Sequence, residues 1–264
     1  MLVTTVAVLA ACSSSNDDQG ALTVIEALDG DTLDVVLEDG SSDRVRLIGI
    51  NAPEAGECFA EESTAALRDL TDGVQITLTS DQSDRDQFDR LLRFVAVDGQ
   101  DVGEVLIANG FALARRYPPD TSRADSYESA QSDARADDEG LWAPDACGST
   151  TEAGEDVTIS AVRFDAEGPD ADNLNDEWIE IRNSGGGVDL TGWTVKDESA
   201  SNRYTFPDGF RLEDGEAVKL RTGCGDDSAD ELFWCRSGAA VWNNDGDTAF
   251  LLDPSGNVVA THDG

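Results

Sequence analysis

The hydrophobic pattern of this chain changes at a short segment rich in Ser, Thr, Gly and Glu, residues 148–155. Before it, short strand-like runs alternate with helical spacing; after it, strand-like runs are separated by clusters of Gly, Asn and Asp. The 264 residues exceed the size of about 100–150 that is usual for one domain. We therefore predict a mixed domain over residues 21–148, a linker over 149–156 and an all-β domain over 157–264.

The first domain shows a small set of short strands. Five strand-like runs cover residues 22–28, 33–37, 44–50, 74–79 and 91–97. Three helical patterns cover residues 61–70, 101–110 and 124–139. In the second of these, Asp101 is followed three residues later by Glu104, which is a helix-capping signal. Five strands with short helices packed against them predict a five-stranded Greek-key barrel of the oligonucleotide-binding kind, the OB-fold.

The second domain has the spacing of a β-sandwich. Its strand-like runs cover residues 157–164, 178–182, 193–195, 218–221 and 248–252. Turn-forming residues separate them, as in two packed antiparallel sheets. The predicted fold class of the whole chain is therefore mainly β, in two domains.

Charge constrains the partners of the chain. Asp and Glu number 55 against 18 Lys and Arg, so the formal net charge is -37. Because nucleic-acid binding normally demands a basic surface, this charge excludes a non-specific binder. We interpret it as a solubility feature, suited to a saline habitat in which repulsion is screened within about 3 Å at 1 M salt. A local arginine pocket could still bind phosphate within such a field.

The N-terminus has the composition of an export signal. Residues 2–11 are apolar and residues 13–18 are polar, and the apolar run is too short to span a membrane. Leu9-Ala10-Ala11-Cys12 resembles the bacterial lipoprotein box, in which the cysteine becomes the lipidated first residue. We expect residues 1–20 to be signal peptide and polar tether, and the mature protein to be anchored through Cys12 on the outer face of the membrane. The alternative is a buried first strand.

Four cysteines remain if Cys12 carries lipid: Cys58, Cys147, Cys224 and Cys235. Exported proteins favour disulfides, and four cysteines allow three pairings. Pairing within each domain, Cys58 with Cys147 and Cys224 with Cys235, is the economical choice. Metal binding is the weaker alternative, because the sequence has no CxxC and its single histidine lies in the tail.

Three polar segments of the first domain could carry chemistry. They are Asp29-Gly30-Asp31-Thr32, Arg46-Leu47-Ile48-Gly49-Ile50-Asn51-Ala52-Pro53-Glu54, and Asp86-Gln87-Phe88-Asp89-Arg90-Leu91-Leu92. Singly, these segments are typical of a hairpin turn or an ordinary ion pair. Together and in order they resemble the staphylococcal nuclease family, over about residues 22–142. The resemblance implies an OB-fold enzyme that hydrolyses DNA and RNA with Ca²⁺, cutting the 5′ side of the phosphodiester and leaving 3′-phosphates.

The same resemblance implies the ligands of the metal ion. Asp31 and Asn51 would supply side-chain oxygens to Ca²⁺, and Ala52 would supply its carbonyl. Hard oxygen ligands in flexible geometry suit this ion. The family's second metal carboxylate is replaced here by Asn51, so we expect weaker Ca²⁺ binding than with two aspartates.

The catalytic roles implied by the resemblance fall on three charged residues. Arg46 and Arg90 would clamp the scissile phosphate with their planar guanidinium groups, and Glu54 would orient or deprotonate the attacking water. An aromatic residue and a glycine commonly precede the second arginine, and here that pair is Phe88-Asp89. We expect Asp89 to neutralise part of the clamp.

A further group of residues could bind the substrate. Arg115, Arg116 and Tyr117 could line the groove by charge and base stacking. The alternative is that these residues only surround the start of a helix.

Three segments of the second domain resemble the lamin-tail domain, an immunoglobulin-like sandwich often appended to bacterial secreted nucleases. They cover residues 175–183, 189–193 and 242–247. We expect the tryptophans to be core anchors and the Asp/Asn loops to be turns. Adhesion or substrate retention near the envelope is the contribution that this domain could make, and its protein partner is not identified by the sequence.

Two classes of function therefore compete. One is a Ca²⁺-dependent nuclease acting on a nucleic-acid substrate. The other is a catalytically inactive nucleic-acid-binding or envelope adhesion and scaffold protein, because the same barrel serves many functions. Asp31, Arg46, Glu54 and Arg90 occur together, and this favours the enzyme, since a binding module has no need of a carboxylate facing the phosphate.

Overall fold

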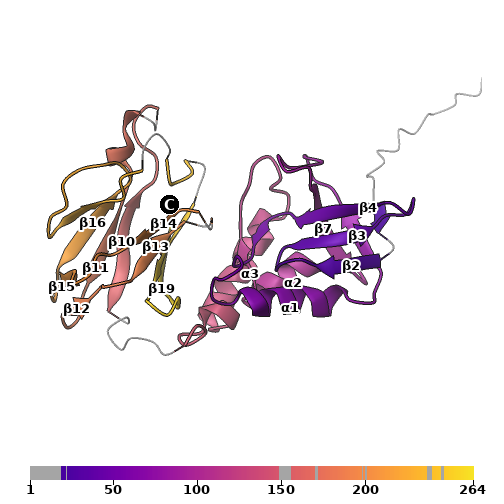
Figure 1. Cartoon of the computed structure of the whole chain (residues 1–264), viewed down its shortest axis with the longest axis horizontal. Helices are drawn as coiled ribbons and strands as arrows, with labels where there is room; N and C mark the ends of the chain where they lie inside the picture. Colours follow the sequence, from indigo (N-terminus) through magenta and orange to yellow (C-terminus); the bar gives the residue numbers. More distant parts are fainter. Residues whose placement is uncertain are drawn as a thin grey trace, which may run out of the picture.

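The computed structural model describes residues 19–21, 23–148, 156–169, 172–197, 199, 201–236, 240–244 and 247–264. Cys12 and nearly all of the predicted linker lie outside these residues. Figure 1 shows two bodies side by side, the earlier part of the chain in indigo to magenta and the later part in salmon to yellow. Within the described residues, no helix is both long enough and apolar enough to cross a membrane.

The first domain is built on one sheet with the strand order β1-β6-β7-β4-β3-β2, to which β8 is added beside β7. Its strands are β1 (Gln19–Ala21), β2 (Thr23–Ala27), β3 (Thr32–Val36), β4 (Ser42–Leu47), β6 (Ile76–Thr79), β7 (Leu91–Val97) and β8 (Gln100–Asp101). The five expected strands are all present. Residues 19 and 20, predicted from the sequence to end the polar tether, belong to β1, whose backbone pairs with β6.

Two short strands outside this sheet pair with each other. β5 (Ile50–Asn51) pairs with β9 (Leu113–Ala114) in a separate two-stranded ladder. Among the described residues, the outer strands β1 and β2 are not paired with each other, so hydrogen bonding does not close the sheet into a barrel. The mainly β, OB-fold class is nevertheless confirmed, with three helices as expected.

Helices α1 (Ala60–Thr71), α2 (Val102–Ala108) and α3 (Ala124–Ala136) lie together beside the sheet (Figure 1). The predicted cap of α2 forms, because the Asp101 side chain accepts the Glu104 N–H at 3.2 Å. α3 ends three residues earlier than predicted and is followed by a 3₁₀ turn, η1 (Gly140–Trp142). A Cβ on Gly140 would lie 2.4 Å from the Asn109 carbonyl oxygen, so only glycine allows this close approach.

The second domain is a sandwich of two four-stranded sheets, which confirms its predicted class. One sheet contains β10 (Val157–Arg163), β11 (Trp178–Asn183), β16 (Ala217–Arg221) and β17 (Glu231–Phe233). The other contains β14 (Arg203–Thr205), β13 (Thr194–Lys196), β18 (Thr248–Leu252) and β19 (Val258–Asp263). β12 (Val188–Asp189) pairs with β15 (Arg211–Leu212), and η4 (Leu174–Asp176) is a 3₁₀ turn. Trp193 and Trp242 are buried in the core between the sheets, as expected of anchors.

The two domains share a small apolar core of their own. Trp142 of the first domain stacks on Phe250 of the second, with ring centroids 6.4 Å apart, and Leu141 and Leu252 are buried in the same cluster. Both intradomain disulfides, Cys58–Cys147 and Cys224–Cys235, are formed as predicted. The first of these bonds therefore ties the segment that follows β5 to the C-terminal end of the first domain.

Candidate active site

Most of the residues selected from the sequence line a single cavity of about 610 Å³ in the first domain. Those that line it are Asp31, Arg46, Asn51, Glu54, Arg90, Arg115 and Tyr117. They come from the turn before β3, from β4 and β5, from the loop that follows β5, and from the segments before β7 and after β9. The fold therefore gathers side chains that are up to 86 positions apart, from Asp31 to Tyr117, around one hollow.

Asp31 is a buried carboxylate of the cavity, at 6% exposure. Its Oδ2 accepts the Ala52 N–H at 2.9 Å, and its Oδ1 accepts the Thr32 hydroxyl at 3.0 Å. Burial raises the pKa of this carboxyl, although the nearby Arg46 opposes the shift. Gly30 makes the arrangement possible, because a Cβ there would lie 2.6 Å from the Cβ of Ala52. The glycine allows the turn to approach the loop that Asp31 contacts.

The two side chains proposed as metal ligands both lie beside the guanidinium group of Arg46. Arg46 Nη2 lies 2.9 Å from Asp31 Oδ2 and 3.4 Å from Asn51 Oδ1. Among the described residues, no three His, Cys, Asp or Glu side chains cluster as metal ligands. A metal here would therefore need amide and carbonyl oxygens besides Asp31. This donor set of hard oxygens fits Ca²⁺. Ala52 is buried beside Asp31 and lines a neighbouring cavity rather than this one.

Arg90 is paired with a different carboxylate from the one expected. Its Nε donates to Asp86 Oδ2 at 2.6 Å, and its backbone N–H donates to Asp86 Oδ1 at 3.0 Å. Burial raises the pKa of Asp86, but these bonds and the Phe88 N–H outweigh it and hold the pKa below its usual range. Asp89 lies 3.7 Å from Arg85 instead. The carboxylate that pairs with Arg90 is thus Asp86, a pairing that the order of residues in the sequence did not indicate.

The left-handed conformation of Asp89 explains the departure from the family pattern. Its φ of 66° lies in the region that favours glycine, the residue common at this place in the family. Aspartate tolerates that region better than most residues, because its short polar side chain can bond locally. The turn that presents Arg90 is therefore retained without the glycine.

Two aromatic rings at the cavity are exposed to solvent. Phe88 is 70% exposed and Tyr117 is 61% exposed, which is unusual for large apolar side chains. The guanidinium carbons of Arg90 and Arg115 lie 5.5 Å and 5.7 Å from their ring centroids. Exposed rings next to arginines are typical of platforms on which bases stack. In the sequence Phe88 stands out only as a departure from the family pattern, and its motif indicates no role for the ring.

The structure does not bring Arg116 to the cavity. Its side chain pairs with Glu128 and Asp125 on α3, at 2.8 Å and 2.5 Å. Arg115 and Tyr117, on either side of it in sequence, do line the cavity. Alternation along an extended segment explains the difference, since neighbouring side chains point in opposite directions.

Glu54 is exposed on the loop that follows β5. Its backbone N–H donates to Glu57 Oε2 at 3.0 Å, and its carbonyl accepts the Glu57 N–H at 2.8 Å. These two bonds fold the loop around Glu54, which lines the cavity. Glu57 carried no signal in the sequence, because its partners in the second domain are distant along the chain.

The fold and the arrangement of this site define an OB-fold domain of a known family. Residues 44–144 match the family described as staphylococcal nuclease homologue, and residues 150–263 match the lamin tail domain. The chain belongs to the staphylococcal nuclease family, and its second domain is a lamin tail domain.

Known proteins similar to the first domain carry nuclease names. A micrococcal nuclease of Shigella flexneri is 33% identical over 128 residues, which is 45% of this chain and 71% of that protein. Endonuclease YncB of Bacillus subtilis is 32% identical over 129 residues, 46% of this chain and 61% of that protein. A thermonuclease of Staphylococcus hyicus is 26% identical over 134 residues, 48% of this chain and 79% of that protein. This chain thus matches less than two thirds of the length of the Bacillus relative.

Proposed function

We propose that the chain is a Ca²⁺-dependent phosphodiesterase that hydrolyses DNA or RNA by attack of water on phosphorus. The observation that carries this proposal is the convergence of one buried carboxylate, two arginines and one exposed glutamate on a single cavity. Two exposed aromatic rings at the same cavity suit the bases of a single strand. The nuclease names of the relatives support the same class of reaction.

The residues divide the work of phosphoryl transfer. Arg46 and Arg90 bind the non-bridging phosphate oxygens, where negative charge develops in the transition state. Glu54 accepts a proton from the attacking water. The water oxygen bonds to phosphorus, the bond to the 5′ oxygen breaks, and that oxygen takes a proton from solvent water and leaves as a hydroxyl. The products are a 3′-phosphate and a 5′-hydroxyl.

Ca²⁺ would be held by the Asp31 carboxylate, the Asn51 amide oxygen and the Ala52 carbonyl. When bound, it supplies Lewis-acid stabilisation of a phosphoryl oxygen. Arg46 Nη2 already lies beside both side-chain oxygens, which supports the view that this corner of the cavity is built for positive charge.

Hydrolysis of labelled single- and double-stranded DNA and of RNA, in Ca²⁺ and in chelator, tests the proposal. Glu54→Gln should lower kcat by about 10²–10⁴-fold while oligonucleotide binding persists, because it removes a base without removing volume. Asp31→Ala should abolish the Ca²⁺ dependence. Glu61→Gln, at an exposed glutamate in the first turn of α1, is the matched control and should leave the rate unchanged. Absence of cleavage by the wild type would favour the inactive binding protein, whereas equal cleavage in chelator, or full activity of both variants, would contradict this assignment of the metal and of the catalytic residues.

We also propose that the mature protein is attached to the outer face of the membrane by lipid on Cys12. The apolar run and the lipobox-like tetrad before this cysteine support it. Mass spectrometry of the N-terminal peptide from cell envelopes should find a diacylglyceryl modification on Cys12. An unmodified mature N-terminus would contradict the anchor.

A further inference from the structure

The loop of residues 53–58 separates the active-site cavity from the second domain. A cavity of about 530 Å³ lies on its other side, lined by residues of both domains, among them Lys196 and Arg203. Asn51 and Glu54 line this cavity as well as the active-site cavity. The second domain therefore reaches the back of the loop that presents the proposed base.

Glu57 connects the two domains at this place. Its Oε1 and Oε2 lie 3.2 Å and 3.4 Å from Lys196 Nζ, and Arg203 Nη2 donates to Oε1. The same carboxylate accepts the backbone N–H of Glu54 at 3.0 Å. One carboxylate thus bonds two cations of the second domain and the backbone of the proposed catalytic glutamate.

The burial of Lys196 makes this contact costly to break. Its residue exposure is 8%, and a buried ammonium without a carboxylate partner loses its hydration without compensation. Burial raises the pKa of Glu57, but Lys196, the Glu54 N–H and Arg203 outweigh burial and hold the pKa below its usual range. Glu57 is therefore ionised at neutral pH and keeps both cations in place.

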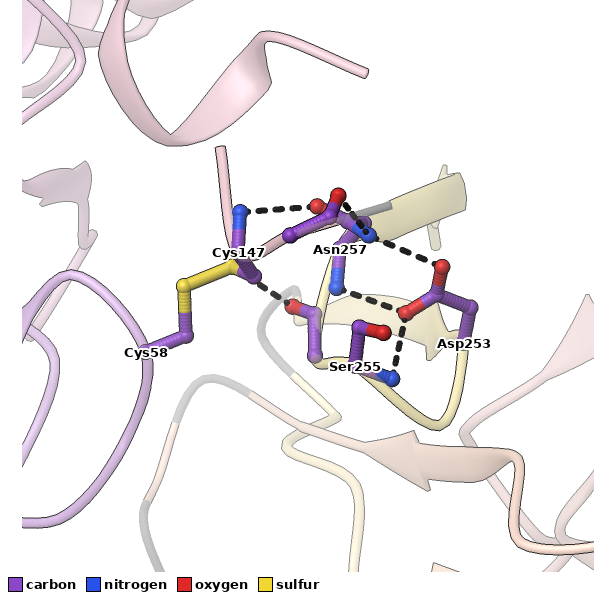
Figure 2. The surroundings of a disulfide bond; sticks show 7 residues. Cys58, Cys147, Asp253, Ser255 and Asn257 are labelled. Atoms are coloured by element: carbon purple, nitrogen blue, oxygen red, sulfur yellow. Dashed lines mark hydrogen bonds between the residues drawn. A yellow bond between two sulfur atoms is a disulfide. The ribbon is translucent and has the colours of Figure 1, made fainter. Parts of the chain in front are cut away.

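The far end of the loop is also held by the second domain (Figure 2). Cys58 is joined to Cys147, whose backbone N–H donates to Asn257 Oδ1 at 2.8 Å. Asn257 is 1% exposed, and its Nδ2 donates to Asp253 Oδ2 at 2.8 Å. Both ends of the segment from Glu54 to Cys58 thus depend on contacts with β-strands or turns of the lamin tail domain.

We propose that the lamin tail domain is part of the catalytic machinery, in that Lys196 and Arg203 hold Glu57 as a positioning residue that orients Glu54 toward the substrate. This inference rests on the proposed nuclease function. It assigns the second domain a role in turnover, beyond adhesion or substrate retention. Because Glu54 would act on water and not on substrate binding, the contact should govern kcat and leave KM unchanged.

The full-length Lys196→Met/Arg203→Met variant tests the inference. Its control is Lys219→Met/Arg211→Met, which removes the same two kinds of charge from β16 and β15, strands outside the sheet that contains β13 and β14. We expect the interdomain variant to lose about 10- to 100-fold in kcat at unchanged KM, the loss typical of a misplaced catalytic group. The control should stay within about twofold of the wild type.

A double-mutant cycle separates positioning from general damage. In a Glu54→Gln background, the interdomain pair of substitutions should cost no further kcat, because the group that it positions is gone. An additive loss, or equal kcat in the interdomain variant and its control, would overturn the inference. The single variant Lys196→Arg should retain most of the wild-type kcat, since it keeps a positive charge beside the Glu57 carboxylate.

Hydrogen exchange of the Glu54 amide decides the inference even if the wild type proves inactive as a nuclease. That amide donates to Glu57, so releasing Glu57 should speed its exchange by about tenfold, the equivalent of one hydrogen bond. The Lys219→Met/Arg211→Met control should show wild-type exchange. Unchanged exchange in the interdomain variant would overturn the positioning role, whereas absence of Ca²⁺-dependent cleavage by the wild type would overturn only the proposed function.

Discussion

Removing the two disulfides separately should affect the protein very differently, because they close loops of different length. Cys58–Cys147 spans 89 positions and Cys224–Cys235 spans 11. A cross-link stabilises mainly by restricting the unfolded chain, and this effect grows with the logarithm of loop length. The chain-entropy relation gives about 4.6 kcal/mol for the long loop and about 2.8 kcal/mol for the short one at 25 °C.

Urea unfolding of Cys58→Ser/Cys147→Ser and of Cys224→Ser/Cys235→Ser measures these values. With a denaturant slope of about 2 kcal/mol/M, the first variant should lower the midpoint of its domain by about 2.3 M and the second by about 1.4 M. Far-UV circular dichroism and tryptophan fluorescence should be followed together, because the two domains can unfold in separate transitions.

Each variant is the control for the other, since each loses one disulfide and has two cysteine sulfurs replaced by hydroxyl groups. The long-loop variant should also lower kcat, because Cys58 ends the loop that carries Glu54, whereas the short-loop variant should not. If the short loop proves as stabilising as the long one, the entropic reasoning fails. If the long-loop variant keeps full kcat at a urea concentration where it is folded, the link between this disulfide and the catalytic loop fails.

Three further predictions concern single residues. Asn51→Asp should tighten Ca²⁺ binding by about tenfold or more in calorimetry, because it adds a charged oxygen beside Asp31, and an unchanged Kd would argue against this ligand set. Phe88→Ala should raise KM for single-stranded oligonucleotides about fivefold or more at constant kcat, since stacking is worth about 1–3 kcal/mol per base; an unchanged KM would remove the ring from the substrate path. Burial raises the pKa of Asp247 from 3.8 to about 6, so protonation favours the folded state. The free energy of unfolding should therefore increase by up to about 3 kcal/mol as pH falls from above 6 to below 3.8, and Asp247→Asn should remove that part of the slope in urea titrations.

Local patterns accounted for much of the fold. The nearly continuous apolar run of residues 91–97 and the helical spacing after Asp101 predicted β7 and α2, because each depends on neighbours within a few positions. Several strands of only two or three residues, among them β5 and β17, were not predicted as separate strands. Such short segments leave no period to read, and their pairing is set by partners far along the chain. β1 was missed for the same reason.

The residues of the candidate site could be named from sequence, because Asp31, Arg46, Glu54 and Arg90 stand in short segments with a family-like order. Their pairings could not. Asp89 is next to Arg90 in sequence, yet the left-handed turn at Asp89 directs its carboxylate to Arg85 and leaves Asp86 to bind the clamp. The direction of the backbone at Asp89, and not closeness in sequence, decides which carboxylate pairs with Arg90.

Local period, composition and short motifs were enough to predict two domains, the pairing of cysteines within each domain as the economical choice, and the types of side chain available for chemistry. The contact of Lys196 with Glu57 across 139 positions, and the hydrogen bond from Cys147 to Asn257 across 110, arise from tertiary packing alone. Both contacts require the β-sandwich to pack on the loop after β5. That packing is driven by the burial of Trp142 against Phe250, a nonlocal gain in apolar contact that no window of sequence contains.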